Sequence, residues 1–339
     1  MPTPRRAARR HGPVVTLLAA ALVTLVACGS DTATGDRTPT DAPTSSPTSA
    51  TAATTGTTAR PGAWTPTNLG PATVPVPEGG VDQTPPKGTN GVAWDGRRLW
   101  VADLAGSQIL AVDPRTGTIQ GRFGTDQGVR GPDDLAVGPD GAVYWTGFSD
   151  GTVGRLGADG TSTTIGNVGA GANPIAFSPD GSLYVGRAVT ADGLFRLDPT
   201  GATPPQEVAA TVGNVNGFAF GPDGAIYGPS YRDQQGSLVR IDPATGAVTE
   251  VLGGLGFPKR GEVRPRGAAY VLTSAPVGVL AVDLATGTST PYATPATKAV
   301  DNLAYDGDGS FVVSSFNEPV LSIIPPAGGE VRTVRIGRG

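Results

Sequence analysis

The sequence predicts an all-β fold, a six-bladed β-propeller of four-stranded antiparallel sheets. Three observations lead to this prediction: a composition rich in glycine and proline, a repeat of roughly 42 residues, and two turn motifs that recur within the repeat. The 339 residues include 51 Gly and 32 Pro, which indicates either a disordered chain or a protein with many turns. Hydrophobic residues make up 38% of the chain and follow a regular pattern, which favours the turn-rich β protein.

Residues 1–27 have the organisation of a bacterial export signal. A basic region with four arginines precedes an apolar run at 14–26, which is too short to span a bilayer comfortably as a stable helix. The run ends in "LVAC", and this segment resembles the lipobox of bacterial lipoproteins. The resemblance implies cleavage before Cys28 and lipidation of that cysteine, so we expect a protein anchored to the membrane on its extracytoplasmic face. A plain secretory signal is the alternative, and both Sec and twin-arginine export stay open.

Residues 28–66 are rich in Thr, Ala, Pro, Ser and Gly and contain few apolar side chains. Such a segment buries too little surface to offset its ordering entropy, so we expect a flexible tether before a propeller domain at 67–339. The net charge is −4, and loss of the signal removes arginines but no acids. The sequence has no basic stripe, which argues against a nucleic-acid partner and leaves the lipid as the membrane anchor.

The chain contains one cysteine and one histidine, Cys28 and His11, and both lie before the predicted domain. A disulfide framework is therefore excluded. A Ser-His-Asp triad, a Cys-His pair and a His-ligated zinc site are excluded for the domain as well.

Each repeat contains four predicted strands and two turns. In the fourth copy these read "GFAF", the turn "GPDG", "IYGPS", "LVRID", the turn "DPATG" and a weaker strand "AVTEVLGG". The copies begin near Asn90, Asp133, Asn173, Asn216, Lys259 and Asp301. A four-stranded sheet cannot bury both faces alone, whereas sheets stacked radially about an axis can. The strand-like "ATVPVP" at 72–77 is expected to pack on the last blade or extend it.

The aspartates in these turns are predicted to form the turns rather than to bind a ligand. Proline sets φ for the first central position, aspartate bonds nearby amides, and glycine takes the left-handed position. The residues concerned are Asp113, Asp140, Asp180, Asp198, Asp223 and Asp242.

The second strands carry aromatic residues that we expect in the blade core, namely Trp100, Trp145, Tyr184 and Tyr227. The first strands share a small residue, which suits the crowding near an axis, at Ala93, Ala136, Ala176, Ala219 and Ala304. The fifth copy departs from this pattern, because Glu262 stands there. Two further apparent motifs, "DGDGS" from Asp306 and the glycine cluster near Gly169, are expected to be a hairpin turn and a connection between strands.

The residue that leads each first strand is polar and is expected at one mouth of the central channel. These six candidate ligand-binding residues are Asn90, Asp133, Asn173, Asn216, Lys259 and Asp301. Converging oxygen atoms suit a hard cation such as calcium, with Asp133, Asn216 and Asp301 as metal ligands, or a polar small molecule. The alternative is that these residues only cap turns beside a wet channel. Arg187, Tyr231 and Asn317 follow second strands and are expected near the same mouth.

The units "NGVAWDGRRLWVAD" and "NGFAFGPDGAIYG" resemble blades of the SMP-30/gluconolactonase/LRE-like superfamily, which is related to NHL-repeat propellers. In the lactonases of that family, a first-blade Glu binds a divalent metal together with an Asn and an Asp from the fourth and fifth blades, and another Asn holds the substrate. The resemblance implies that Asn216 matches the metal-binding Asn and Asn173 the substrate-holding one. Asn90 replaces the Glu and Lys259 replaces the Asp, so two anionic ligands are lost.

Two functions follow as expectations. The first is a cell-surface lipoprotein whose propeller binds a small molecule, a cation or a partner protein at its polar mouth. The second, implied by the resemblance, is a metal-dependent hydrolase of lactones or related esters. The sequence identifies no catalytic residue, and no cofactor follows from it apart from a possible divalent cation.

Overall fold

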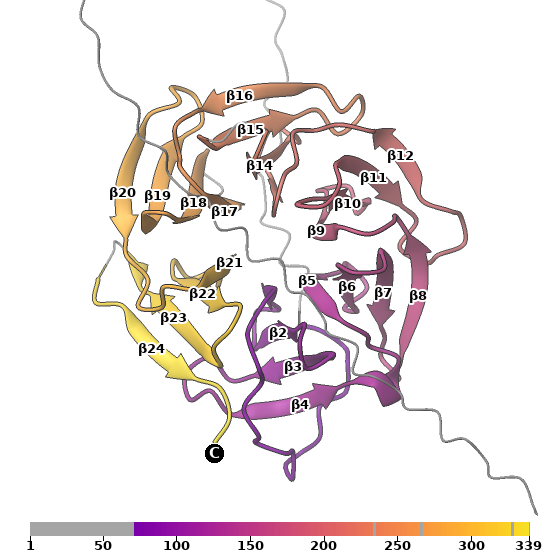
Figure 1. Ribbon diagram of the computed structural model, residues 1–339. Coiled ribbons are helices and arrows are strands. Elements are labelled where there is room, and N and C mark those ends of the chain that lie inside the picture. The colour runs from indigo at the N-terminus through magenta and orange to yellow at the C-terminus, as the bar shows by residue number, and fades with distance from the viewer. Residues whose placement is uncertain (1–70, 233–234, 265–266, 327–328, 339) are drawn as a thin grey trace, which may run out of the picture. The chain divides into compact units, whose positions relative to one another are not determined.

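The computed structural model describes residues 71–232, 235–264, 267–326 and 329–338. These residues form a closed ring of six sheets, each built from four strands that are consecutive in the chain and antiparallel (Figure 1). The predicted fold class is confirmed. The predicted signal, Cys28 and the predicted tether lie outside the described residues. Within the described residues, no helix is both long and apolar enough to cross a bilayer.

The inner strands line the channel, and the second strands pair with them. The inner strands are β1 (Val92–Trp94), β5 (Pro132–Val137), β9 (Ala172–Phe177), β13 (Ala219–Phe220), β17 (Pro258–Val263) and β21 (Val300–Tyr305). The second strands are β2 (Leu99–Asp103), β6 (Val143–Gly147), β10 (Leu183–Arg187), β14 (Ile226–Ser230), β18 (Ala268–Ser274) and β22 (Phe311–Ser315).

The third and fourth strands complete each blade, and the fourth strands form the outer wall in Figure 1. The third strands are β3 (Gln108–Val112), β7 (Thr152–Leu156), β11 (Gly193–Leu197), β15 (Ser237–Ile241), β19 (Val277–Asp283) and β23 (Val320–Ile324). The outer strands are β4 (Ile119–Phe123), β8 (Ser162–Asn167), β12 (Gln206–Ala209), β16 (Val248–Leu252), β20 (Ser289–Ala293) and β24 (Arg332–Arg335). A short 3-10 helix, η1 (Thr125–Gln127), follows β4.

The hydrophobic core consists of clusters that lie between neighbouring blades. In β2, Leu99 and Val101 belong to the cluster shared with the sixth blade, whereas Trp100 and Ala102 belong to the cluster shared with the second. Successive side chains of a strand point to opposite faces, so one run of apolar residues serves two interfaces. The aromatic residues predicted for the core are buried: Trp100, Trp145, Tyr184 and Tyr227 are 0%, 1%, 7% and 6% exposed.

The aspartates of the recurring motifs form turns, as predicted. In the "GPDG" turn of the second blade, Asp140 Oδ1 accepts a hydrogen bond from the Ala142 amide at 3.1 Å, and Gly141 has a φ of 76°. A side chain would resist this left-handed conformation, so glycine is favoured there. The same contact with the amide two residues on recurs at Asp113, Asp180, Asp198, Asp223 and Asp242.

The expected position of "ATVPVP" is wrong. Val74 packs in the cluster between the first and second blades, and the Thr73 amide donates to the Gly141 carbonyl at 2.8 Å. Val76 packs against the same cluster, so the segment covers the interface of the first two blades and does not extend the last blade.

The ring closes between the sixth and first blades without exchange of a strand among the described sheets. The Thr89 hydroxyl accepts a hydrogen bond from the Ser315 amide at 2.8 Å and lies 3.0 Å from the Val320 carbonyl, to which it can donate. Farther out, the Arg338 amide donates to the Gln83 carbonyl at 2.8 Å, and the Gln83 side chain bonds both backbone groups of Ile119. Backbone and side-chain hydrogen bonds therefore join the two ends of the propeller.

We expect Thr89→Val to lower the free energy of unfolding by about 1–3 kcal/mol, because it leaves buried backbone groups of the sixth blade without a partner. Chemical denaturation followed by tryptophan fluorescence measures the change. Thr286→Val is the matched control, because this threonine is exposed in an outer turn; its effect should stay within about 0.5 kcal/mol. Equal effects of the two substitutions would contradict a closing role for Thr89.

Candidate functional site

The six predicted ring residues converge at one end of the channel. Five of them, together with Asp134 and Asn302, line one small pocket; these are Asp133, Asn173, Asn216, Lys259 and Asp301. The sixth, Asn90, donates its side-chain amide to Asp301 Oδ2 at 3.2 Å. We call the six residues the polar ring.

Irregular strand pairing places these residues at the channel. The register between inner and second strand shifts between Pro132 and Leu135 in β5, and again between Val300 and Leu303 in β21. Comparable shifts occur in β9 and β17, where Asn173 and Lys259 stand. A bulge re-aims the side chains within it, which lets two consecutive residues line the channel.

Hydroxyl groups of the second strands hold the bulged segments. Thr146 accepts from the Asp134 amide at 3.2 Å and donates to the Asn173 carbonyl at 2.8 Å. Ser314 plays the corresponding part in the sixth blade, accepting from the Asn302 amide at 2.9 Å and donating to the Asn90 carbonyl at 2.6 Å. Each hydroxyl therefore ties one blade to the next at the level of the polar ring.

Amide and carboxylate side chains pair around the polar ring. Asn173 donates to Asp133 Oδ2 at 2.8 Å, in the same way as Asn90 donates to Asp301. Burial raises the pKa of Asp133 well above its usual range, and the negative charges of Asp301 and Asp134 raise it further. Burial also raises the pKa of Asp301. The charge of Lys259 lowers both pKa values, so this lysine is the compensating cation of the mouth.

Tyr231 lies beside the polar ring, as expected from its place after β14, and forms a hydrogen bond with Asn216. Burial raises the pKa of its hydroxyl to about 12, and a hydrogen bond with Asn216 acts in the opposite direction. Arg187 does not point to the mouth, because its guanidinium lies 5.2 Å from the ring centre of Phe195 in β11, farther out in the same blade. Asn317 accepts from the Ser315 hydroxyl at 3.4 Å.

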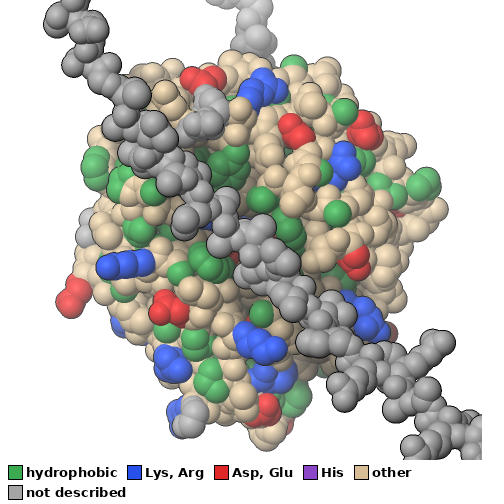
Figure 2. All heavy atoms as spheres, in the orientation of Figure 1, with side chains coloured by type: hydrophobic (Ala, Val, Ile, Leu, Met, Phe, Trp, Pro, Cys, Tyr) green, Lys and Arg blue, Asp and Glu red, His purple; other side chains and the backbone are tan. Residues whose placement is uncertain are grey.

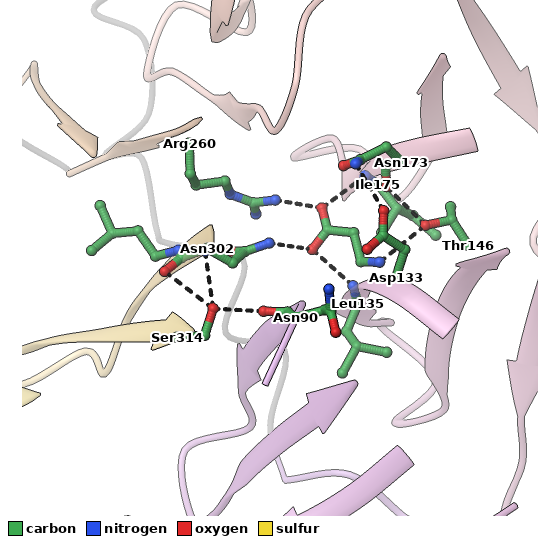
Figure 3. A network of polar contacts seen from close by, with 11 residues as sticks. Asn90, Asp133, Leu135, Thr146, Asn173, Ile175, Arg260, Asn302 and Ser314 are labelled. Atoms are coloured by element: carbon green, nitrogen blue, oxygen red, sulfur yellow. Dashed lines mark hydrogen bonds and ion pairs between the residues drawn. The ribbon is translucent and has the colours of Figure 1, made fainter. Parts of the chain in front are cut away.

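A layer directly below the polar ring was missed from the sequence. Asp134 is 1% exposed, and its carboxylate accepts hydrogen bonds from Arg260, from the Asn302 side chain at 2.9 Å and from the Leu135 amide at 2.9 Å. Figure 3 shows Arg260 and Asn302 pointing from their blades toward this centre. The three side chains form a belt that crosses the channel and joins the second, fifth and sixth blades.

The sequence does contain a signal for this belt. Three polar-ring residues are followed directly by a second polar residue, at Asp134, Arg260 and Asn302. The other three are followed by Gly or Pro. Two adjacent polar residues at the start of an apolar strand indicate a bulge in which both face the channel.

The mouth does not fit a resident divalent cation. The pocket volume is about 10 Å³, close to the room that one water molecule needs. Asp134 is committed to the belt, and the Lys259 side chain lines the same pocket and compensates part of the charge of the two ring carboxyl groups, which disfavours a second cation there. In the part of the chain that the structure describes, no group of three or more His, Cys, Asp or Glu side chains is placed to hold a metal.

Fold and polar ring together define a six-bladed propeller with a charged channel mouth. Solved structures of similar fold include a putative gluconolactonase (14% identity, TM-score 0.56, covering 78% of this chain and 96% of that one). A gluconolactonase from Xanthomonas campestris is 17% identical, with a TM-score of 0.54 and coverage of 68% and 84%. A catalytically inactive histidine-to-alanine variant of virginiamycin B lyase from Staphylococcus aureus, with quinupristin, is 15% identical (TM-score 0.54; 76% and 87%).

A family model described as a repeat of unknown function (DUF6923) matches residues 138–282. No curated protein sequence matches the chain at a significant level. At these identities the structural similarity establishes the propeller fold alone, because one fold can carry many different functions.

We expect Arg260→Met to lower the free energy of unfolding by about 3–5 kcal/mol, because it leaves the Asp134 carboxylate buried without its cation. The double variant Asp134→Asn/Arg260→Met should regain most of that loss. Denaturant unfolding of the four proteins of the cycle measures the coupling. Arg240→Met is the matched control, since its ion pair with Asp223 is about 40% exposed on both sides and should contribute less than about 1 kcal/mol. Additive effects at Arg260 and Asp134 would contradict the belt.

Proposed function

We propose that the protein is a binding propeller whose polar ring forms the floor of a site for a small polyhydroxylated molecule, such as a sugar or a sugar acid. The observation that carries this proposal is the convergence of two carboxylates, one ammonium group and three carboxamides from six different blades. Hydroxyl groups both donate and accept hydrogen bonds, so they can satisfy this mixed set of partners.

The size of the pocket indicates how such a ligand binds. About 10 Å³ admits a single hydroxyl group or water, so the body of the ligand rests above the polar ring. Tyr231 stands beside this position with its hydroxyl bonded to Asn216. The ligand therefore inserts one hydroxyl group into the pocket of the mouth, and the rest of the ligand stays above the polar ring.

Apolar residues on the same face favour a ligand or partner with a hydrophobic part. In the described part of the chain, the large exposed hydrophobic residues are Val189, Phe257 and Phe316, which are 60%, 50% and 48% exposed. Each follows the end of a second strand or precedes an inner strand, which is where the mouth lies. Figure 2 shows hydrophobic side chains dispersed among charged ones on one face of the propeller. A surface protein with a few apolar contacts is an alternative partner for this face.

The alternative function, metal-dependent hydrolysis of lactones, is supported by the neighbours described as gluconolactonases. It needs a cation at the mouth, where the residues present do not fit one. Chemistry like that of the lyase neighbour, whose histidine-to-alanine variant is inactive, has no histidine to use after His11. Binding is therefore the function that the geometry supports best.

We expect a thermal-shift screen of sugars, aldonic acids and their lactones to yield compounds that raise the melting temperature. Asp133→Asn and Lys259→Met should each weaken binding of such a compound at least tenfold by calorimetry, because each removes a charged partner. Asn167→Ala, in an outer strand, is the matched control and should leave the affinity unchanged.

Two outcomes count against this proposal. Unchanged affinity in both ring variants would remove the mouth as the binding site. A rise in melting temperature with calcium or zinc, together with lactone hydrolysis that a chelator abolishes, would establish the hydrolase instead.

We also propose that the protein is anchored by a lipid at Cys28, outside the cytoplasm. The support is the basic region, the apolar run and the "LVAC" segment in the sequence. In a bacterial host fed a labelled fatty acid, the wild type should carry the label and sediment with membranes. Cys28→Ser should lose the label, while Thr32→Ser, a nearby control, should keep it. Label retained in Cys28→Ser would refute the anchor.

A further inference from the structure

The channel has a second cavity at the end opposite to the polar ring. Its volume is about 130 Å³, and inner-strand residues of all six blades line it. The recurring small residue of the inner strands lines the cavity in five blades, at equivalent positions that we call the alanine level. These residues are Ala93, Ala136, Ala176, Ala219 and Ala304. The small side chains leave this part of the channel open.

Glu262 takes the sixth position of this alanine level. It pairs with Tyr270 of β18 just as Ala176 pairs with Tyr184 and Ala219 with Tyr227 in their blades. The carboxyl group therefore projects into a cavity that the other blades leave empty. Among the described residues, no hydrogen bond or ion pair of ordinary length reaches it, and only longer-range charges act on it.

Charged groups around Glu262 compensate it incompletely. Burial raises the pKa of this carboxyl to about 7. The positive charges of Arg260 and Arg264 lower the pKa, and the negative charge of Asp134 raises it. Arg264 is held away by its contacts with aromatic rings, among them Tyr270 at 4.5 Å and Phe311 at 4.2 Å. The ionised carboxyl therefore lacks a close cation.

Arg260 lies between this cavity and the rest of the belt. Arg260 is 6% exposed, and its Nη1 atom donates a hydrogen bond to Asp134. Its buried Nε atom has no hydrogen-bond partner among the described residues. The same side chain lines the cavity. A ligand that enters can thus meet one acceptor, at Glu262, beside a guanidinium that is directed to Asp134.

The remaining walls are apolar and partly aromatic. The last residues of the inner strands line this end of the channel: Trp94, Val137, Phe177, Phe220, Val263 and Tyr305. Aromatic rings attract ammonium groups through their faces and give a good environment for hydrocarbon. A closed cavity of about 150 Å³ holds a benzene-sized molecule, so the present volume of about 130 Å³ limits the occupant to one small ring or a chain of similar size.

We propose that this cavity is a second ligand site, which takes a small primary amine with a benzene-sized hydrocarbon body. The ammonium group pairs with Glu262, and the hydrocarbon fills the space beside the five alanines. The site is separate from the polar ring, because the belt of Asp134, Arg260 and Asn302 crosses the channel between them.

Benzylamine is the probe, with benzyl alcohol and benzoate as isosteres that lack the positive charge. Calorimetry should show saturable binding of benzylamine at millimolar concentration and at least tenfold weaker binding of both isosteres. The affinity should rise from pH 6 to pH 8, since Glu262 ionises in this range while the amine stays protonated.

Three variants test the placement of the ligand. Glu262→Gln keeps the shape but removes the charge, and should weaken benzylamine at least tenfold and abolish the pH dependence. Ala136→Leu fills the cavity at the same level and should block all three probes. Glu207→Gln, exposed on β12, is the matched control and should behave as the wild type.

The proposal is overturned if benzylamine shows no saturable binding, which would mean that the cavity holds water only. It is also overturned if benzyl alcohol binds as tightly as benzylamine, or if Glu262→Gln and Ala136→Leu leave the affinity unchanged. Circular dichroism of each variant confirms that a loss of binding does not come from a loss of fold.

Discussion

The propeller depends on one constraint: a four-stranded sheet has two apolar faces, and both must be covered. Alternation along β2 sends Leu99 and Val101 to one neighbouring blade and Trp100 and Ala102 to the other. No blade therefore has a complete core of its own, and the apolar surface is fully buried only when the ring is closed. Closure brings the six inner strands around one axis, and only this arrangement gathers side chains that are about forty residues apart in the chain.

The channel so formed is divided into a charged end and an apolar end by a single buried carboxylate. Asp134 receives Arg260 and Asn302 from two other blades, so its charge is paired and its oxygen atoms are satisfied. Burying an ion pair contributes little net stability compared with apolar packing, but one partner without the other is strongly unfavourable. The belt therefore acts mainly as a constraint on geometry: it fixes how the second, fifth and sixth blades face one another beneath the polar ring.

The repeat allowed the six sheets, the turn aspartates and the six residues of the polar ring to be predicted from the sequence. Turn chemistry is local, so Asp140 and its counterparts could be assigned without knowledge of the ring.

The belt could not be predicted from the alternation of side chains along a strand. Strict alternation would place Asp134 on a face of the blade, whereas the bulge after Pro132 turns its side chain toward the channel. The position of residues 72–77 could not be predicted, because the segment packs on an interface between two blades that exists only in the assembled ring. Glu262 was visible as a break in the alanine pattern, but its isolation from close cations follows from the aromatic contacts of Arg264.

The seam between the first and last blades has a consequence for the order of folding. Each described sheet is made of consecutive strands, so all but the last blade can form as the chain emerges, yet Thr89 must wait for Ser315 and Val320, and Asn90 must wait for Asp301. Without the sixth blade, the ring is open and one apolar face of the first blade has no covering sheet. The contacts between the second and third blades, such as Asn173 with Asp133, can form earlier, but the closed channel exists only once the sixth blade meets the first.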